Sequence, residues 1–553
     1  MTAPPDSLIV TGIGGTPGQM DLCALEIRDS RIARVWNEHP EIPAGVRVVD
    51  LGGATILPGI EDSHLHAYEF GRSLTALNVA AAVCPDLVAL QKAVAHATPE
   101  SSGWIRGIGW DDTRLTGTGP AGMLCAGDID GAQPDVPVLL TDVTGHQAVV
   151  NSAALRLAGI TAQTPDPQGG VIVRDAKGMP TGLLREGAIG LVNAAMPRLA
   201  PADKRAAILA AQQHLLALGV TSVTEPGLGP GASTLMDGSG DLDVVQAYRD
   251  LADEGELHLR VEVMLLFGGL GGTRANDVAA GLDAWGVPSR MAPLGHLGVA
   301  QVKVFADGIP RSRTAWMIEP YDDCTHGHLT VAGDTDQERE RELRAIILAA
   351  SSRGWQVGVH TTGDRASQAT VAAFVEQETD ASSLRHYIIH GDFTPRQSLA
   401  LMAQNGITLN ANPGIRWMIG DGVAGIIGPR RTAERQPLRT AWELGVNVCS
   451  SSDAPVTPPD WRPILAAAVT RSVRTDPERT DGEGLTMDQA VASMTTNAAW
   501  QSHAEGWRGR VAEGMAADLV VLDGTLDPAD PWALTDVPAR ATLVGGVVRH
   551  GSL

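Results

Sequence analysis

Cysteine is scarce and scattered in this 553-residue sequence. Its five cysteines are odd in number, lie far apart and form no Cys-x-x-Cys pair; they are Cys23, Cys84, Cys125, Cys324 and Cys449. This spacing argues against a disulfide framework and against a structural zinc knot. We therefore expect the reducing environment of the cytoplasm.

Long apolar runs and a basic excess are also missing. No stretch approaches the ~20 uninterrupted apolar residues of a membrane helix, and residues 1–7 have neither the basic start nor the apolar core of a signal peptide. The net charge of −22 argues against nucleic acid and anionic membrane surfaces as partners, because both are polyanions. With nucleic acid and membranes disfavoured, we expect the partner to be a small-molecule substrate.

Lysine is rare as well. It accounts for only four of the 42 basic residues, at Lys92, Lys177, Lys204 and Lys303. The first three lie in polar or helical surroundings, whereas Lys303 has apolar neighbours on both sides. In a chain that uses arginine so heavily, a lysine in this context indicates that amine chemistry is needed there.

What the sequence does contain is a regular alternation of apolar strands with helical patterns. Eight strand candidates can be recognised, at residues 54–57, 220–224, 259–265, 299–305, 356–360, 386–390, 407–411 and 446–450. Eight such units predict an α/β fold of the closed parallel kind, a (β/α)8 TIM barrel.

Both ends of the chain have a different texture, with short strands and glycine-rich turns. We expect them to meet in one small β-sandwich domain, built from residues 1–56 and 505–553. The barrel would then occupy residues 57–504. Because a barrel usually needs ~250 residues, residues from about 68 to 200 are predicted to be an insertion after the first barrel strand.

Polar residues collect at the predicted carboxyl ends of the barrel strands, where barrel active sites lie. His64 and His66 stand two apart, so on an extended backbone their imidazoles point to the same side. By itself such a pair is weak evidence, because two surface histidines would look the same. Four further strand ends supply complementary metal ligands, however: Lys303, His360, His390 and Asp453. This coincidence across five strands favours a metal centre.

Two of these residues have chemistry beyond simple ligation. Burial and neighbouring cations favour the neutral amine of Lys303, which can capture carbon dioxide as a carbamate and bridge two ions. Alternatively, Lys303 reaches the barrel mouth as a core lysine or holds a substrate carboxylate. Asp453 can be both a ligand and a proton shuttle at a metal-bound water, or merely a helix cap after the strand.

Several motifs resemble those of the amidohydrolase superfamily, and more narrowly amidohydrolase family 3, the branch that contains the N-substituted formamide deformylases. The similar segments cover nearly the whole chain; they begin at Pro58, Trp104, Gly145, Val302, Val359, Ser452, Thr495 and Gly514. The resemblance implies a (β/α)8 barrel with a β-sandwich from both termini. It also implies a homo-oligomer, a dimer or larger.

The same resemblance implies how the ligands are shared. His64 and His66 would bind one metal, His360 and His390 the other, and carboxylated Lys303 would bridge them. Asp453 would contact the first metal and carry the proton. Two divalent ions per chain are expected, with zinc favoured by the histidine-rich ligand set.

Three departures from the family pattern matter. Glu61 replaces the usual aliphatic residue beside the histidine pair, where it either perturbs the metal site or faces solvent. Ile309-Pro310-Arg311 replaces the commoner Ser-Leu-Gly and could reshape the pocket floor. The usual Glu before His390 is missing, which puts the support of that ligand in doubt.

Three residues are further candidates for substrate contact. His146 could donate a hydrogen bond to a substrate oxygen, or could serve only to tie down the insertion. Trp110 and Arg313 are pocket candidates too, although Trp is more often a packing residue and Arg more often an ion-pair partner.

Together these features predict a metal-dependent amidohydrolase that cleaves a carbon–nitrogen bond. A metal-bridging hydroxide would attack an amide, formamide or cyclic amide with an apolar nitrogen substituent, and Asp453 would pass the proton to the leaving nitrogen. A mononuclear deaminase, esterase or lactonase on the same barrel is the nearer alternative. A catalytically silent binding or regulatory barrel is a third, which the intact ligand set argues against.

Overall fold

The centre of the molecule is a barrel of eight parallel strands in the order β18-β17-β16-β15-β14-β13-β12-β5. We describe it from a computed structural model that covers residues 7–553 apart from 17–20, 44, 112–114, 118–122, 144, 168–169, 232–239, 270–271 and 378–380. The strands are β5 (Ile60–Asp62), β12 (Val220–Leu228), β13 (Arg260–Leu265), β14 (Leu297–Phe305), β15 (Gln356–Thr361), β16 (Tyr387–His390), β17 (Thr408–Ala411) and β18 (Val448–Ser450). The predicted fold class is confirmed.

Helices cover the outside of the barrel, as a buried parallel sheet requires. They are α6 (Pro201–Ala217), α7 (Leu242–Asp253), α8 (Ala275–Trp285), α9 (Asp336–Ser351), α10 (Asp364–Val375), α11 (Ala381–Leu384), α12 (Arg396–Gln404), α13 (Pro413–Ile427), α14 (Pro429–Ala433), α15 (Leu438–Glu443), α16 (Trp461–Thr470), α17 (Met487–Ser493) and α18 (Thr496–Gln501). Several begin at a capping side chain; Thr335, for example, accepts the Glu338 N–H in a capping box at the start of α9. β12 and β13 are buried along their whole length.

The first barrel strand is not the one that the sequence predicts. The apolar run at residues 54–57 belongs to β4 (Arg47–Pro58), which pairs with β1 and β19 in the terminal sheet. The barrel strand is β5, which has only three residues, two of them acidic. The apolar run is buried all the same, because the terminal sheet supplies its neighbours.

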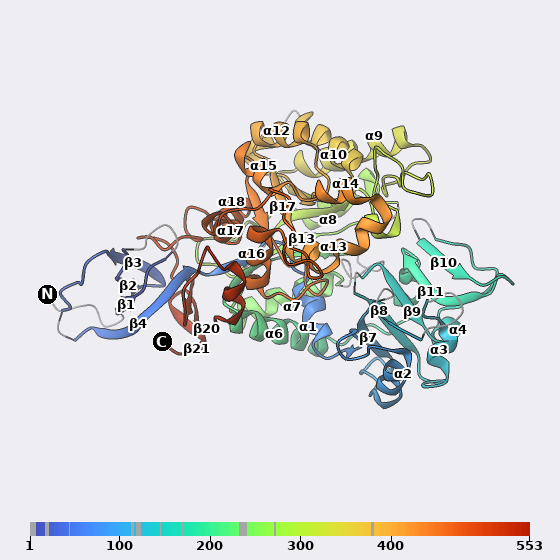
Figure 1. Cartoon of the computed structure of the whole chain (residues 1–553), viewed down its shortest axis with the longest axis horizontal. Helices are drawn as coiled ribbons and strands as arrows, with labels where there is room; N and C mark the ends of the chain where they lie inside the picture. The colour runs from blue at the N-terminus through green and yellow to red at the C-terminus, as the bar shows by residue number, and fades with distance from the viewer. Residues whose placement is uncertain are drawn as a thin grey trace.

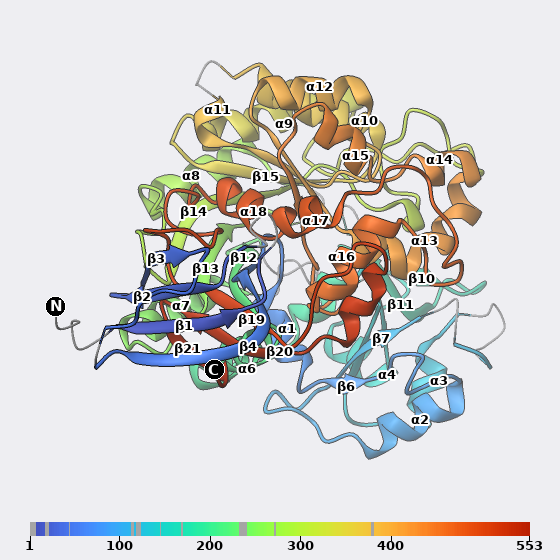
Figure 2. The same cartoon turned by 60° about the vertical axis from the view of Figure 1, so that its left-hand side comes forward.

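Both ends of the chain build one seven-stranded sheet in the order β21-β20-β19-β4-β1-β2-β3. Its other strands are β1 (Leu8–Ile13), β2 (Ala24–Arg28), β3 (Arg31–Trp36), β19 (Leu519–Leu522), β20 (Ala539–Val544) and β21 (Val547–Gly551). Figure 2 shows the blue N-terminal strands beside the red C-terminal ones. A shared apolar core from both ends holds them together.

The segment of the chain between β5 and β12 forms a separate lobe. This lobe lies on the side of the barrel away from the terminal sheet (Figure 1). Its six-stranded sheet has the order β10-β11-β9-β8-β7-β6. The helix α1 (Ala67–Ser73) comes first and packs on α6 of the barrel. The elements of the lobe are β6 (Leu77–Asn78), α2 (Leu87–His96), β7 (Ile105–Trp110), α3 (Ala126–Asp130), β8 (Val138–Asp142), β9 (Gln147–Val150), α4 (Ser152–Leu157), β10 (Gly170–Arg174), β11 (Pro180–Glu186) and α5 (Ile189–Asn193).

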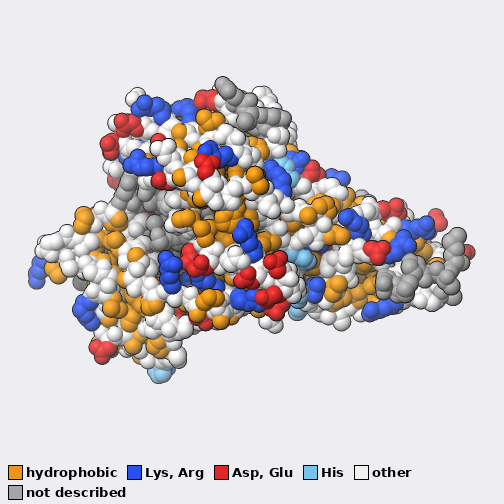
Figure 3. Space-filling model, turned by 180° about the vertical axis from the view of Figure 1, so that it is seen from behind, with side chains coloured by type: hydrophobic (Ala, Val, Ile, Leu, Met, Phe, Trp, Pro, Cys, Tyr) orange, Lys and Arg blue, Asp and Glu red, His pale blue; other side chains and the backbone are white. Residues whose placement is uncertain are grey.

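The outer surface carries mixed charge. On the face seen in Figure 3, basic and acidic side chains are interspersed with apolar ones. Among the residues that the structure describes, no helix combines the length and the apolar character needed to span a membrane.

Candidate metal centre and pocket

The six predicted ligands meet at the carboxyl ends of the barrel strands. Each comes from, or directly follows, one of five strands, and each is at most 8% exposed: His64 and His66 after β5, Lys303 in β14, His360 in β15, His390 in β16 and Asp453 after β18. Parallel strands bring their carboxyl ends to one rim, so residues that are almost 400 positions apart become neighbours.

Asp453 and the two histidines after β5 form one half of the cluster. Asp453 Oδ1 lies 3.4 Å from His64 Nε2 and 3.2 Å from His66 Nε2. Lys303 Nζ also lies 3.4 Å from His64 Nε2. Two potential ligands, Asp453 and Lys303, therefore lie within 3.4 Å of a single imidazole nitrogen.

His360 and His390 form the other half. Their ring centroids are 4.6 Å apart, and the His390 ring lies 5.7 Å from that of His64. One ligand atom each of His64, His390 and Asp453 lies within 4.8 Å of the others. Such convergence of buried imidazole and carboxylate atoms suits a divalent transition metal.

The chemistry of the cluster also fits a metal. Asp453 Oδ1 is buried and accepts no hydrogen bond from the part of the chain that the structure describes. Leaving a carboxylate oxygen in that condition is costly unless a cation lies nearby. The donors available to a metal here are imidazole nitrogens and a carboxylate, together with a lysine amine.

Backbone contacts hold the first and last barrel strands together at this point. Asp453 N–H donates to the His64 carbonyl oxygen at 2.9 Å, and His66 N–H donates to that of Ala454 at 3.0 Å. Asp453 and His390 both have positive φ angles, 57° and 68°. Non-glycine residues rarely adopt this conformation, and it gathers at functional sites when the surrounding structure enforces it.

Asn412 supports His390 in place of the missing glutamate. Its Oδ1 lies 2.6 Å from His390 Nδ1, while its Nδ2 donates to Ser451 Oγ at 3.0 Å. The doubt about the support of His390 is thereby removed. Asn412 follows β17, and no local motif marks it in the sequence.

A buried carboxylate also lies near His360. Asp307 Oδ1 is 3.8 Å from His360 Nδ1, and the Asp307 oxygens accept backbone N–H groups from Thr362, Gly363 and Trp316 at 2.8–2.9 Å. Burial raises the pKa of Asp307 to about 7 in spite of these hydrogen bonds.

Glu61 neither faces solvent nor contacts the metal ligands through a described hydrogen bond or ion pair. Its carboxylate is 3% exposed and forms two short contacts with Arg508, 3.1 Å from Nε and 3.0 Å from Nη2. It therefore joins the first barrel strand to the segment that leads into the terminal sheet.

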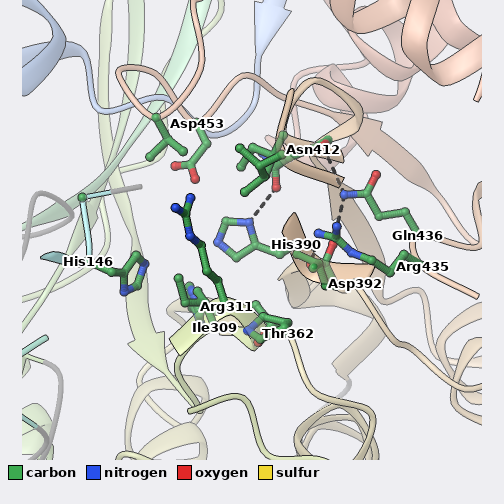
Figure 4. Close-up of a pocket in the computed structure, with 17 residues that line it drawn as sticks. His146, Ile309, Arg311, Thr362, His390, Asp392, Asn412, Arg435, Gln436 and Asp453 are labelled. Carbon is green, nitrogen blue, oxygen red and sulfur yellow. Dashed lines mark hydrogen bonds and ion pairs between the residues drawn. The ribbon is translucent and has the colours of Figure 1, made fainter. Parts of the chain in front are cut away.

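A pocket opens beside the metal cluster (Figure 4). It is lined by Gly145, His146, Ile309, Pro310, Arg311, His360, Thr362, His390, Asp392, Asn412, Ile415, Ile419, Val423, Arg435, Gln436, Asp453 and Val456. The lining includes the Ile309-Pro310-Arg311 segment, in line with the prediction that this departure shapes the pocket.

His146 reaches this pocket from the lobe. Its Nδ1 lies 2.8 Å from Glu186 Oε2, and its ring centroid is 6.4 Å from that of His360. Arg311 extends from the loop after β14 toward Asp453 (Figure 4), and its Nη2 pairs with Asp111 Oδ1 of the lobe at 3.2 Å.

Two predicted substrate residues lie elsewhere. Trp110 is 2% exposed in the core of the lobe, where its Nε1 donates to the Leu140 carbonyl oxygen. Arg313 is paired with Asp322 at 2.9 Å at the surface. Neither lines the pocket, because burial of the indole and the turn at residues 310–312 direct them away.

The sequence motifs do not identify a polar group on the pocket wall that lies across from His146 (Figure 4). Arg435 Nη2 donates to Asp392 Oδ2 at 2.6 Å, and Gln436 Nε2 donates to Asp392 Oδ1 at 3.0 Å. Asp392 follows β16, whereas Arg435 and Gln436 lie between α14 and α15. No spacing pattern joins them in the sequence.

Known proteins are similar to this chain over most of its length. The chain is 29% identical over 506 residues to the putative amidohydrolase YtcJ of Bacillus subtilis, covering 90% of each chain. It is 28% identical over 577 aligned positions to the N-substituted formamide deformylase of Arthrobacter pascens, covering 100% of this chain and 99% of that one.

Solved structures share the fold. An uncharacterized metal-dependent hydrolase from Pyrococcus horikoshii is similar, with a TM-score of 0.73 and 23% identity, over 99% of this chain and 100% of that one. The sequence model of the amidohydrolase family matches residues 47–550. The motifs at the strand ends therefore lie within a match that spans nearly the whole chain, and the chain belongs to the amidohydrolase family.

Proposed function

We propose that this protein is a metal-dependent hydrolase of a non-peptide carbon–nitrogen bond in an amide, formamide or cyclic amide. The observation that carries the proposal is the position of Asp453, whose Oδ1 lies within 3.4 Å of two imidazole nitrogens at the edge of a pocket. The similarity to an N-substituted formamide deformylase supports the formamide class, and the apolar side chains that line the pocket support an apolar nitrogen substituent.

Two divalent ions, with zinc favoured, fit the six donors. His64 and His66 would hold the first ion with Asp453, and His360 and His390 the second. When bound, such ions act as Lewis acids that polarise a carbonyl and lower the pKa of a water towards ~7. The remaining chemistry belongs to side chains of this protein.

Lys303 would serve as a carbamate. Its neutral amine would form a bond to the carbon of carbon dioxide and pass one proton to water, and the resulting carbamate would offer anionic oxygens as metal ligands. The amine is 1% exposed and 3.4 Å from His64 Nε2. An anion at this position would replace a cation that the ions would repel.

Asp453 would move the proton. As the attacking water loses a proton, the Asp453 carboxylate accepts it and then gives it to the leaving nitrogen, so the amine departs neutral. His146, whose Nδ1 is held by Glu186, would donate a hydrogen bond from Nε2 to the substrate carbonyl oxygen as an imidazolium, the form in which both ring nitrogens carry a proton. Ile415, Ile419 and Val423 of α13 would contact the apolar substituent.

One observation favours a second candidate. His64, His390 and Asp453 alone bring three ligand atoms within 4.8 Å of one another, which is a complete protein ligand set for one ion. A mononuclear deaminase, esterase or lactonase on the same barrel would use that set.

The test is a screen of N-substituted formamides, acyl amides and esters on metal-loaded protein. We expect about two ions per chain and formamide hydrolysis, lowered about 10²- to 10⁴-fold in Asp453→Asn. Lys303→Ala should lose at least one ion and most activity, whereas Lys177→Ala, which alters an exposed lysine, should change neither.

Other results would contradict the proposal. One ion per chain with an active Lys303→Ala variant would favour the mononuclear alternative. Unchanged turnover in Asp453→Asn would contradict the role of Asp453 as the proton shuttle.

A further inference from the structure

Arg435 is a buried cation in the pocket wall whose hydrogen-bonding capacity is only partly used. Its side chain is 2% exposed, and Nη2 donates to Asp392 Oδ2 at 2.6 Å. Within the described ranges, Arg435 Nε and Nη1 are buried and have no hydrogen-bond partner. A buried N–H without a partner is destabilising, and more so on a charged group.

Among the arginines that line the pocket beside the metal cluster, Arg435 is in this condition. Elsewhere in the described chain, buried arginine nitrogens without a partner belong to Arg106, Arg471 and Arg549. None of these three lines the pocket beside the metal cluster, whereas Arg435 does. Figure 4 shows Arg435 and Asp392 beside His390, on the side away from His146.

The described residues around Arg435 do not supply hydrogen-bond acceptors for its Nε and Nη1. Asp392 Oδ1 is already taken by Gln436 Nε2 at 3.0 Å, and that same nitrogen also contacts the Asn412 carbonyl oxygen at 3.1 Å. Both contacts are to acceptors, so the Gln436 side chain directs its amide nitrogen, and not its oxygen, at them. Gln436 therefore orients Asp392, and Asp392 holds Arg435 in place from one side.

The charge of the pocket also favours an anion. The lining carries two guanidinium groups, Arg311 and Arg435, and two carboxylates, Asp392 and Asp453, before any divalent ion is counted. Just outside the lining, Asp111 pairs with Arg311. With metal bound, the pocket carries a positive excess that attracts an anionic substrate. The same lining includes the apolar side chains of Ile415, Ile419 and Val423.

We propose that Arg435 binds a carboxylate of the substrate, so that the substrate class is an amide that bears a carboxylate as well as an apolar chain. The proposal rests on the amide hydrolysis proposed above and deepens it. Arg435 supplies charged N–H donors, Asp392 and Gln436 fix the guanidinium, and the apolar wall of α13 accepts the chain between the scissile amide and the carboxylate.

The experiment measures kcat/KM on the metal-loaded protein for N-formyl ω-amino acids with three to six carbons, each against its own carboxamide. The two members of a pair differ only in charge. We expect the carboxylate to be preferred about 10- to 100-fold for at least one chain length, the range expected for hydrogen bonds to a charged group.

Variants then identify the binding residue. Arg435→Lys keeps the charge beside Asp392 but loses the planar fork, and Arg435→Gln combined with Asp392→Asn replaces the ion pair by amides of similar shape. Both should abolish most of the preference for the carboxylate. Arg430→Gln, at an exposed arginine of α14, is the matched control and should preserve the preference.

The outcomes separate the two proposals. No hydrolysis of any neutral or charged formamide would contradict the amide hydrolysis itself. Hydrolysis without preference for the carboxylate at any length would overturn only the carboxylate subsite. A preference that is lost in Arg311→Gln and kept in both Arg435 variants would overturn the assignment to Arg435.

Discussion

Asn412 determines which nitrogen of His390 is available to a metal. Asn412 Nδ2 donates to Ser451 Oγ at 3.0 Å, and Ser451 Oγ in turn donates to Asn410 Oδ1 at 2.6 Å. Asn412 Oδ1 must therefore be the acceptor of the 2.6 Å contact with His390 Nδ1. The proton lies on Nδ1, and Nε2 keeps its lone pair for a metal.

Removal of this contact should weaken metal binding. We expect Asn412→Ala to lower metal affinity about 10- to 100-fold, because the ring of His390 loses both its orientation and its tautomer. Titration of the metal-free protein with zinc measures the affinity. Asn405→Ala, at the end of α12, is the matched control, and equal affinities in the two variants would refute the role of Asn412.

Glu262 should make stability depend on pH. Burial raises its pKa to about 7, an effect that Arg508 and Arg290 oppose and Glu61 reinforces. Because the folded pKa lies above the unfolded value of 4.5, the folded state holds the proton more tightly. Protonated Glu262 therefore contributes its full stabilisation of the folded state below about pH 4.5. This contribution is lost as the pH rises towards about 7.

Glu262→Gln should therefore match the wild type near pH 5 and be more stable at pH 8, by about 3 kcal/mol at most. The midpoint of thermal unfolding from pH 5 to 8 measures the difference. A difference that does not vary with pH would show that Glu262 stays ionised in the folded protein.

The ion pair between Glu61 and Arg508 should be needed for folding stability. Arg508→Met leaves the Glu61 carboxylate buried without its partner, which typically costs about 3–5 kcal/mol. Glu61→Gln combined with Arg508→Met should be less destabilised, because no charge is stranded. Thermal unfolding compares the variants, and a single variant no worse than the double one would contradict a structural role.

Gly71 permits α1 to pack closely on α6. A Cβ at this position would collide with the Ala207 carbonyl oxygen. We expect Gly71→Ala to destabilise the protein by about 1–3 kcal/mol through overpacking. Gly422→Ala is the control: it lies in α13 with open space around it, and should stabilise by about 0.5–1 kcal/mol. Equal unfolding midpoints for the two variants would rule out the close approach.

The barrel could be predicted because its signal is local and repeated. Each strand is a short apolar run, and residues such as His360 and His390 stand at the end of a run, where parallel topology brings them to one rim. The first strand escaped prediction because β5 is short and acidic, while the apolar run before it serves another sheet.

The pocket wall was harder to predict because it depends on contacts between loops. Asn412 and Arg435 carry no motif, and their partners lie 22 and 43 residues away. Residue type and proximity to a motif are the features that favour Trp110 and Arg313 as pocket residues. Side-chain direction, which neither feature specifies, takes the first into the core of the lobe and the second to the surface.

The strand β4 has a consequence for the order in which the molecule is made. It pairs with β19, more than 460 residues later, and Gly59 N–H, directly after β4, donates to the Asp518 carbonyl oxygen. During synthesis the segment that carries His64 and His66 therefore leaves the ribosome long before its neighbours exist. His64 and His66 reach their final surroundings only when nearly the whole chain has emerged. A truncated chain therefore contains both histidines but lacks the strands that orient them.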